Sequence, residues 1–184
     1  MGDKEFIRKV YLPNLKGRVL FVGYSSDYNY DSLVPNPDLF ESVDVDKSKN
    51  PTHVCDFMHE FESEFKYNHI SLHGLWGNGF VFIDTNLSEK KYGHGREVET
   101  LKLSKMVYHS IQKAHSMLTV GGTLEIGPNT NNIIPIYDSL IESNFYQKLY
   151  RINRGENGCG NCIFWGKKLV DNKINFEEVD LWRE

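Results

Sequence analysis

The chain has 184 residues, a formal net charge of −4 and 13% aromatic residues. This length predicts one domain that can bury a core without disulfides or metals, and the acidic balance argues against a nucleic-acid partner. Apolar runs fall short of the roughly 18 residues that a membrane span needs, and the charged N-terminus lacks the apolar stretch of a secretory signal. With three cysteines, an odd number, these features predict a cytoplasmic protein.

The N-terminal part of the chain contains an apolar run that ends at a glycine. Residues 4–12 form either a short amphipathic helix or an extended lead-in, and residues 18–22 predict a buried strand that Gly23 follows directly. An apolar run between glycines is typical of a central parallel strand that leads into a tight turn. The stretch 24–38 is polar and holds two prolines, so we expect only a short helical turn near 30–34.

Three further strands are predicted in the first half of the chain. Apolar runs indicate strands over 39–45, 53–56 and 67–73. Between the last two of these, phenylalanines recur every four residues over 57–66, which predicts a helix with an apolar face in the core. Because crossovers in such sheets are right-handed, we expect the strands to be parallel.

A long glycine-rich stretch and a long helix follow. Residues 75–95 carry several glycines and aromatic residues, with one short strand over 80–83. Loops of this length in compact domains are usually functional or mobile. The helical period predicts a helix over 96–118, and we expect the glycine pair at 121–122 to end it.

The rest of the chain predicts a strand, a helix and a hairpin. The strand covers 123–126 and the helix 132–143. Two strands over 145–153 and 161–167 flank a glycine-rich turn and form the hairpin. Residues 170–184 are polar and acidic, so we expect them to form a surface appendage.

Acidic residues stand where a sheet of this kind binds nucleotides. Asp44 and Asp46 lie at the end of the second predicted strand, about 20 residues after Gly23. In open α/β sheets the ligand lies at the carboxyl ends of the strands, and an acid at this position binds a ribose hydroxyl. The alternative for Asp44 is a solvated acid at a strand end.

The order of elements resembles that of class I S-adenosylmethionine-dependent methyltransferases, from about residue 16 to 168. The resemblance rests on the acidic segment 43–46, on an Asn-Pro that precedes a second acid within 50–56, and on a Leu-x-x-Gly-Gly pattern over 118–122. It implies an α/β fold, a three-layer Rossmann-like sandwich with a mostly parallel seven-stranded sheet that ends in an antiparallel hairpin. Residues 1–184 would form a single methyltransferase-like domain.

The same resemblance implies S-adenosylmethionine as cofactor and assigns residues to it. Asp44 would bind the ribose, and Asp56 the adenine with Phe57 beside the base. The alternative for Asp56 is the N-cap of a helix that begins near Phe57. The full set of expected cofactor-binding residues is Gly23, Tyr24, Ser25, Ser26, Asp44, Val45, Asp56, Phe57, His73 and Gly74.

Two histidines are the candidates for catalysis. His73 ends the predicted fourth strand and His94 lies in the long loop, and an imidazole at either place could act as a general base. The plain alternatives are a polar residue that closes a strand and a residue of a surface loop. Cys159 and Cys162 form a Cys-x-x-Cys pair, but two ligands do not make a structural zinc site, so we expect no metal.

The resemblance implies O- or N-methylation of a small-molecule or sugar acceptor. Two alternatives stay open. The family's first motif is Gly-x-Gly-x-Gly, and here Gly23 stands alone, which also fits a non-catalytic binding or partner subunit. An NAD-linked enzyme on a related sheet is the other alternative, and the missing Gly-x-Gly-x-x-Gly speaks against it. The sequence leaves the oligomeric state open.

Overall fold

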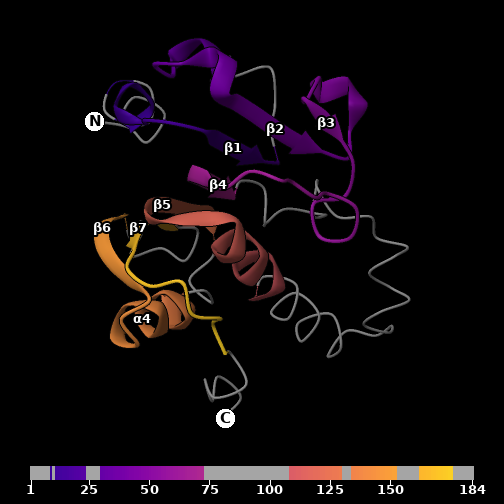
Figure 1. Ribbon diagram of the computed structural model, residues 1–184. Coiled ribbons are helices and arrows are strands. Elements are labelled where there is room, and N and C mark those ends of the chain that lie inside the picture. Colours follow the sequence, from indigo (N-terminus) through magenta and orange to yellow (C-terminus); the bar gives the residue numbers. More distant parts are fainter. Residues whose placement is uncertain are drawn as a thin grey trace, which may run out of the picture.

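The computed structural model describes residue 9 and residues 11–23, 30–72, 108–129, 134–152 and 162–175. The described residues form one seven-stranded sheet with the order β3-β2-β1-β4-β5-β7-β6 (Figure 1). Its strands are β1 (Val19–Val22), β2 (Phe40–Asp44), β3 (His53–Val54), β4 (Tyr67–Leu72), β5 (Leu118–Asn129), β6 (Tyr146–Ile152) and β7 (Cys162–Lys168). Neighbours pair in parallel from β3 to β5, whereas β7 runs antiparallel to both β5 and β6. The predicted sheet and its terminal hairpin are confirmed.

Helices cover one face of the sheet. The helical residues 108–117 and α4 (Ile134–Glu142) lie on the same side of it in Figure 1. Apolar side chains from both pack with alternate residues of the central strands. This helical-side core includes Leu20, Val22, Ile70, Leu72, Ile111, Ala114, Leu124, Ile126, Tyr137 and Leu140.

The opposite face is covered by chain that precedes β1 and β2. Two short 3-10 turns, η2 (Leu12–Asn14) and η4 (Asp31–Leu33), belong to this layer, and the second confirms the short turn expected near 30–34. The buried residues of this N-terminal-side core are Tyr11, Leu12, Leu15, Val19, Phe21, Tyr30 and Val34. Both faces of β1 are therefore buried, as its continuous apolar run predicts.

The helix predicted over 57–66 is wrong. Residues 57–60 form a turn, and no regular element follows before β4. Phe57 and Phe61 are buried as expected, but Phe65 is 53% exposed. The guanidinium of Arg18 lies 4.0 Å from the centre of the Phe65 ring, so this aromatic ring packs under a cation at the surface instead of joining the core.

Two other expectations also need correction. β5 begins at Leu118, so the glycine pair at 121–122 lies within this strand, where its register with β4 shifts. The described part of the expected surface appendage packs on the protein, because Ile174 is 3% exposed and joins the helical-side core. The Gln112 side chain donates a hydrogen bond to the Ile174 carbonyl at 2.8 Å, which ties this segment to helix 108–117.

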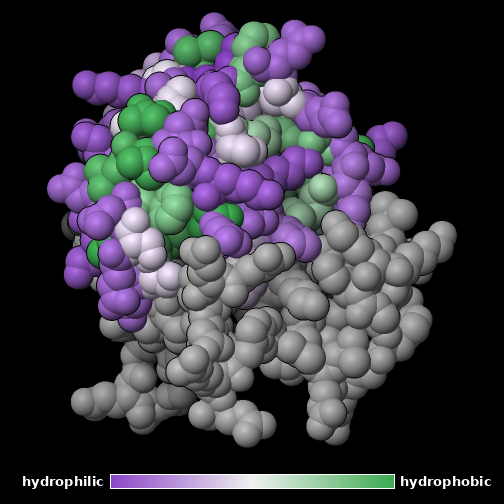
Figure 2. Space-filling model, turned by 60° about the horizontal axis from the view of Figure 1, so that its bottom comes forward, coloured by the Kyte–Doolittle hydropathy of each residue, from purple (hydrophilic) through white to green (hydrophobic). Residues whose placement is uncertain are grey.

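The described surface is mostly polar. On the face in Figure 2, hydrophobic residues form small groups among hydrophilic ones. Within the described ranges, no helix has the length and apolar character to cross a bilayer.

We predict that Gly17→Ala lowers the free energy of unfolding by about 2–3 kcal/mol. Gly17 has a φ of +73°, which is strained for any residue with a Cβ. A Cβ there would also overlap the Asn68 side chain, whose Oδ1 accepts a hydrogen bond from the Arg18 backbone at 3.0 Å. Urea unfolding curves measure the loss.

The matched control is Gly121→Ala. Gly121 has a φ of +83°, but a Cβ there would meet nothing within 4 Å. We expect this variant to lose about 1–2 kcal/mol from the backbone conformation alone. Equal losses in the two variants would contradict a role for the Gly17–Asn68 contact.

Candidate functional site

The carboxyl ends of β1, β2 and β3 meet at one corner of the sheet. The backbone N–H of Gly23, directly after β1, donates to the Val43 carbonyl of β2 at 2.9 Å. The backbone N–H of Cys55, directly after β3, donates to the Asp44 carbonyl at 3.1 Å. These two bonds fix the chain after β1 and the chain after β3 on either side of the last residue of β2.

Gly23 forms the turn that the sequence predicts after the first strand. Its φ of +76° is in the left-handed region, which favours glycine. The backbone therefore bends at Gly23, at the edge where sheets of this type bind their ligands.

Asp44 is a buried carboxylate at this corner. It is only 1% exposed, so the alternative of a solvated strand-end acid is wrong. Its Oδ1 accepts a hydrogen bond from the Asp46 backbone at 2.8 Å. Burial raises the pKa of Asp44 to about 6, and the backbone hydrogen bond from Asp46 opposes this rise only in part. The protein thus holds an acid here in an environment that disfavours its charge.

Asp56 is equally buried but is occupied by its own chain. Its Oδ1 accepts hydrogen bonds from the backbones of Met58, at 2.7 Å, and His59, at 3.0 Å. Its Oδ2 lies 3.1 Å from Nδ1 of the His59 ring. The backbone N–H of Asp56 in turn donates to Glu60 Oε2 at 2.9 Å. Asp56 therefore has the capping role that was its alternative, although it caps a turn and not a helix.

The remaining expected cofactor residues divide into two groups. Phe57 is fully buried in the helical-side core, with its ring centre 5.9 Å from that of Phe61, whereas Val45 is 37% exposed. The others lie outside the described residues, and they are Tyr24, Ser25, Ser26, His73 and Gly74. The catalytic candidate His94 also lies outside them. The structure thus brings Gly23, Asp44 and the segment beginning at Asp56 to one corner.

Sequence reasoning missed a polar network inside the N-terminal-side layer. The Tyr11 hydroxyl contacts Nε2 of His69 and lies 3.5 Å from Oε2 of Glu125. Ser71 also donates to Glu125, which is 2% exposed. Burial, followed by the charge of Glu125, raises the pKa of Tyr11, so its phenol stays protonated. The sequence signal was the pair of polar residues His69 and Ser71, two positions apart on β4, of which Ser71 is opposite Glu125 in the β4–β5 register.

No side-chain group in the described part of the chain combines three or more His, Cys, Asp or Glu residues in a position to hold a metal ion. That the Cys159–Cys162 pair holds no metal stays a prediction, because Cys159 lies outside the described residues.

Neither a protein-family model nor a curated protein sequence matches this chain. Its fold is similar to solved methyltransferase structures. The N-methyltransferase NodS from Bradyrhizobium japonicum has 11% identity and a TM-score of 0.52, with 84% of this chain and 86% of that chain covered. A SAM-dependent O-methyltransferase from Thermotoga maritima has 10% identity and a TM-score of 0.53, over 94% of this chain and 66% of that one.

A third similar structure contains a cofactor product. It is the 1,6-didemethyltoxoflavin-N1-methyltransferase of Burkholderia thailandensis with 1,6-didemethyltoxoflavin and S-adenosylhomocysteine bound, at 9% identity and a TM-score of 0.52, over 91% of this chain and 77% of that chain. These similar structures are thus methyltransferases that use S-adenosylmethionine or bind its product, and the activities named for them differ. The chain has the fold of the class I S-adenosylmethionine-dependent methyltransferases.

Proposed function

We propose that this protein is an S-adenosylmethionine-dependent methyltransferase that acts on oxygen or nitrogen of a small-molecule or sugar acceptor. The observation that carries the proposal is the buried Asp44 carboxylate beside the left-handed turn at Gly23. Burying a carboxylate is costly unless hydrogen-bond donors reach it. The two hydroxyls of a ribose are such donors, and in sheets of this type a ribose lies at the end of the second strand.

The other residues take the roles that the resemblance implies for them. The turn at Gly23 would let the backbone approach the cofactor, and Tyr24, Ser25 and Ser26 would follow along its methionine part. Because the carboxylate of Asp56 already holds the 56–59 turn, its contribution would be to fix the backbone at Phe57 beside the adenine. Val45, His73 and Gly74 would complete the pocket. The cofactor supplies the activated methyl group.

The class of acceptor is proposed from the net charge of the chain, and the catalytic base from two of its histidines. A net charge of −4 favours a small molecule or sugar over a nucleic acid. His73 and His94 are the proposed general bases for an acceptor that must lose a proton. A cytoplasmic location is part of the same proposal.

A methyltransferase-like partner subunit without cofactor is the second candidate function. The observation that favours it is that both carboxylate oxygens of Asp56 are engaged within the protein. Binding of S-adenosylhomocysteine separates the two candidates. Isothermal titration calorimetry with this ligand, and with NAD as control, should give saturable binding of the first compound alone.

We predict that Asp44→Asn weakens S-adenosylhomocysteine binding by about 10–100-fold at pH 8, as expected for the loss of hydrogen bonds to a charged acceptor. The substitution keeps the side-chain shape and the acceptor for the Asp46 N–H. Asp46→Asn is the control, since it removes the same charge two residues away. An unchanged dissociation constant in Asp44→Asn would refute the ribose assignment.

The same carboxylate predicts how binding depends on pH. Because the pKa of Asp44 is about 6 in the folded protein, the ionised form that accepts ribose hydroxyls is lost below this pH. Affinity for S-adenosylhomocysteine should fall by up to tenfold for each pH unit below about 6. The Asp44→Asn variant should lack this dependence, and an equally steep profile in the variant would assign the effect to another group.

Asp44 should also cost stability when no ligand is bound. Its pKa is raised on folding, from 3.8 to about 6, so folding favours the protonated form. Above pH 6 the buried carboxyl is ionised and lowers the free energy of unfolding most. This cost shrinks as the pH falls below 6, because the carboxyl is then protonated in the folded protein. At pH 8, Asp44→Asn should raise the free energy of unfolding by about 1–3 kcal/mol, and the gain should shrink at pH 5. Urea unfolding at both pH values measures this, and a destabilised variant at pH 8 would contradict it.

A further inference from the structure

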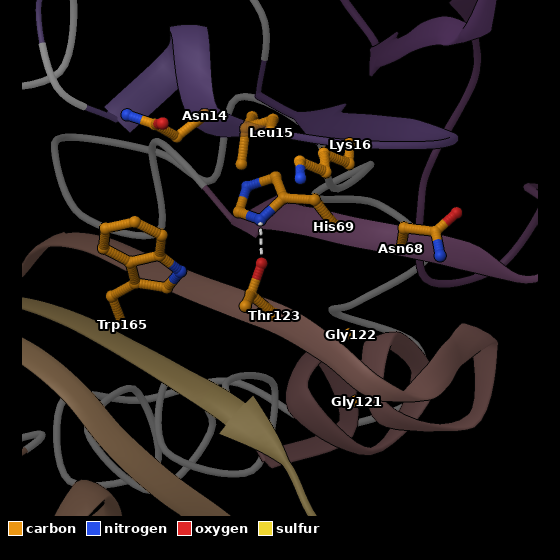
Figure 3. Close-up of a pocket in the computed structure, with 9 residues that line it drawn as sticks. All are labelled: Asn14, Leu15, Lys16, Asn68, His69, Gly121, Gly122, Thr123 and Trp165. Atoms are coloured by element: carbon orange, nitrogen blue, oxygen red, sulfur yellow. Dashed lines mark hydrogen bonds between the residues drawn. The ribbon is translucent and has the colours of Figure 1, made fainter.

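A pocket of about 230 Å³ lies at the amino ends of β4 and β5, on the N-terminal side of the sheet (Figure 3). Its lining comes from the chain before β1 and from β4, β5 and β7. His69 in the lining pairs with Val19, the first residue of β1, whereas Leu72 pairs with Val22 at the candidate cofactor edge. Three residues of strand separate these levels, or about 10 Å. The pocket is therefore distinct from the proposed cofactor site.

The floor of the pocket is fixed by hydrogen bonds. The His69 side chain is 1% exposed, and both of its ring nitrogens have partners. Nδ1 lies 2.7 Å from the Thr123 hydroxyl, shown by the dashed line in Figure 3, and Nε2 contacts the Tyr11 hydroxyl. The floor thus keeps its shape without a ligand, which favours binding because no ordering is needed.

One wall holds a buried donor. The Trp165 indole packs edge-on against Tyr11, with ring centres 4.5 Å apart. Its Nε1 is buried and has no hydrogen-bond partner among the described residues. An indole N–H can only donate, and a buried donor without an acceptor is costly. In Figure 3 the nitrogen side of the indole is turned toward His69 and Thr123, so an acceptor inside the pocket would satisfy it.

The rest of the lining specifies the character of that acceptor. Lys16, which is exposed, belongs to the lining, and none of the described residues that line the pocket is acidic. Glu125, which is opposite Trp165 in the β5–β7 register, is not part of the lining. Leu15, which is 4% exposed, and the indole give the pocket apolar walls. The pocket volume equals that of several water molecules at about 30 Å³ each. A ligand with roughly one substituted ring would fill this volume. A cation, a neutral donor and apolar walls match a carboxylate on a small planar body.

We propose that this pocket binds a small organic carboxylate with a planar apolar group. The carboxylate accepts the Trp165 indole N–H and pairs with the Lys16 ammonium, while the apolar body packs between Leu15 and the indole. Such a ligand joins the segment before β1 to three strands of the sheet. Its binding therefore stabilises the fold from the edge opposite the cofactor site.

Benzoate is the probe for the test. In ¹H–¹⁵N spectra of the labelled protein, benzoate should shift the Trp165 indole resonance, identified by its loss in Trp165→Phe, to saturation. The backbone amides of Gly122 and Thr123 report binding in every variant. We expect the dissociation constant for benzoate to rise tenfold or more in Trp165→Phe and in Lys16→Gln, as for loss of a charge-assisted hydrogen bond.

Three controls make the result decisive. Lys148→Gln removes an exposed lysine on β6 and should bind benzoate as the parent does. Asp44→Asn should also bind benzoate normally, which separates failure of this pocket from failure of the proposed cofactor site. Benzamide, which lacks the charge, should bind at least tenfold more weakly. Absence of a saturable indole shift, or equal binding of benzamide and benzoate, would overturn the proposal.

Discussion

Burial of β1 on both faces is the constraint on which the rest of the structure depends. Its four residues, Val19–Val22, have no solvent-facing side, so each face needs its own covering layer. Leu20 and Val22 lie in the helical-side core, and Val19 and Phe21 in the N-terminal-side core. β2 and β4 pair with β1 in parallel on either side, so the carboxyl ends of the three strands lie at the same edge of the sheet. Gly23 and the acid that ends β2, Asp44, lie close together at this edge.

Two acids at this corner show how environment decides what a carboxylate can do. Asp44 and Asp56 are each 1% exposed. Asp56 is surrounded by backbone N–H groups of its own turn, which use its oxygens within the protein. Asp44 accepts a hydrogen bond from the backbone N–H of Asp46, and burial raises its pKa to about 6. Asp56 therefore stabilises its own turn, whereas Asp44 bears a desolvation cost that its own hydrogen bonds offset only in part.

The parts of the fold that the sequence predicted are those with a local physical cause. Apolar runs identified the strands, and the glycine after the first run identified a turn that requires positive φ. The sequence predicted that Asp44 lies at the end of the second strand. Its burial could not be predicted, because it depends on residues distant in sequence. The predicted 57–66 helix failed because the spacing of Phe57, Phe61 and Phe65 does not reveal that Arg18 covers Phe65. The burial of Ile174 lacked any periodic signal, and the pocket at Trp165 needs four separate segments.

The position of β7 has a consequence for how the chain reaches this structure. The last strand among the described residues, β7, lies between β5 and β6, so β5 and β6 share no hydrogen bonds with each other. During synthesis from the N-terminus, β5 therefore has an unpaired edge until residue 168 has left the ribosome. An open edge of this kind can pair with another chain. β7 fills the gap within the sheet, and a chain that stops before it leaves the facing edges of β5 and β6 both unpaired.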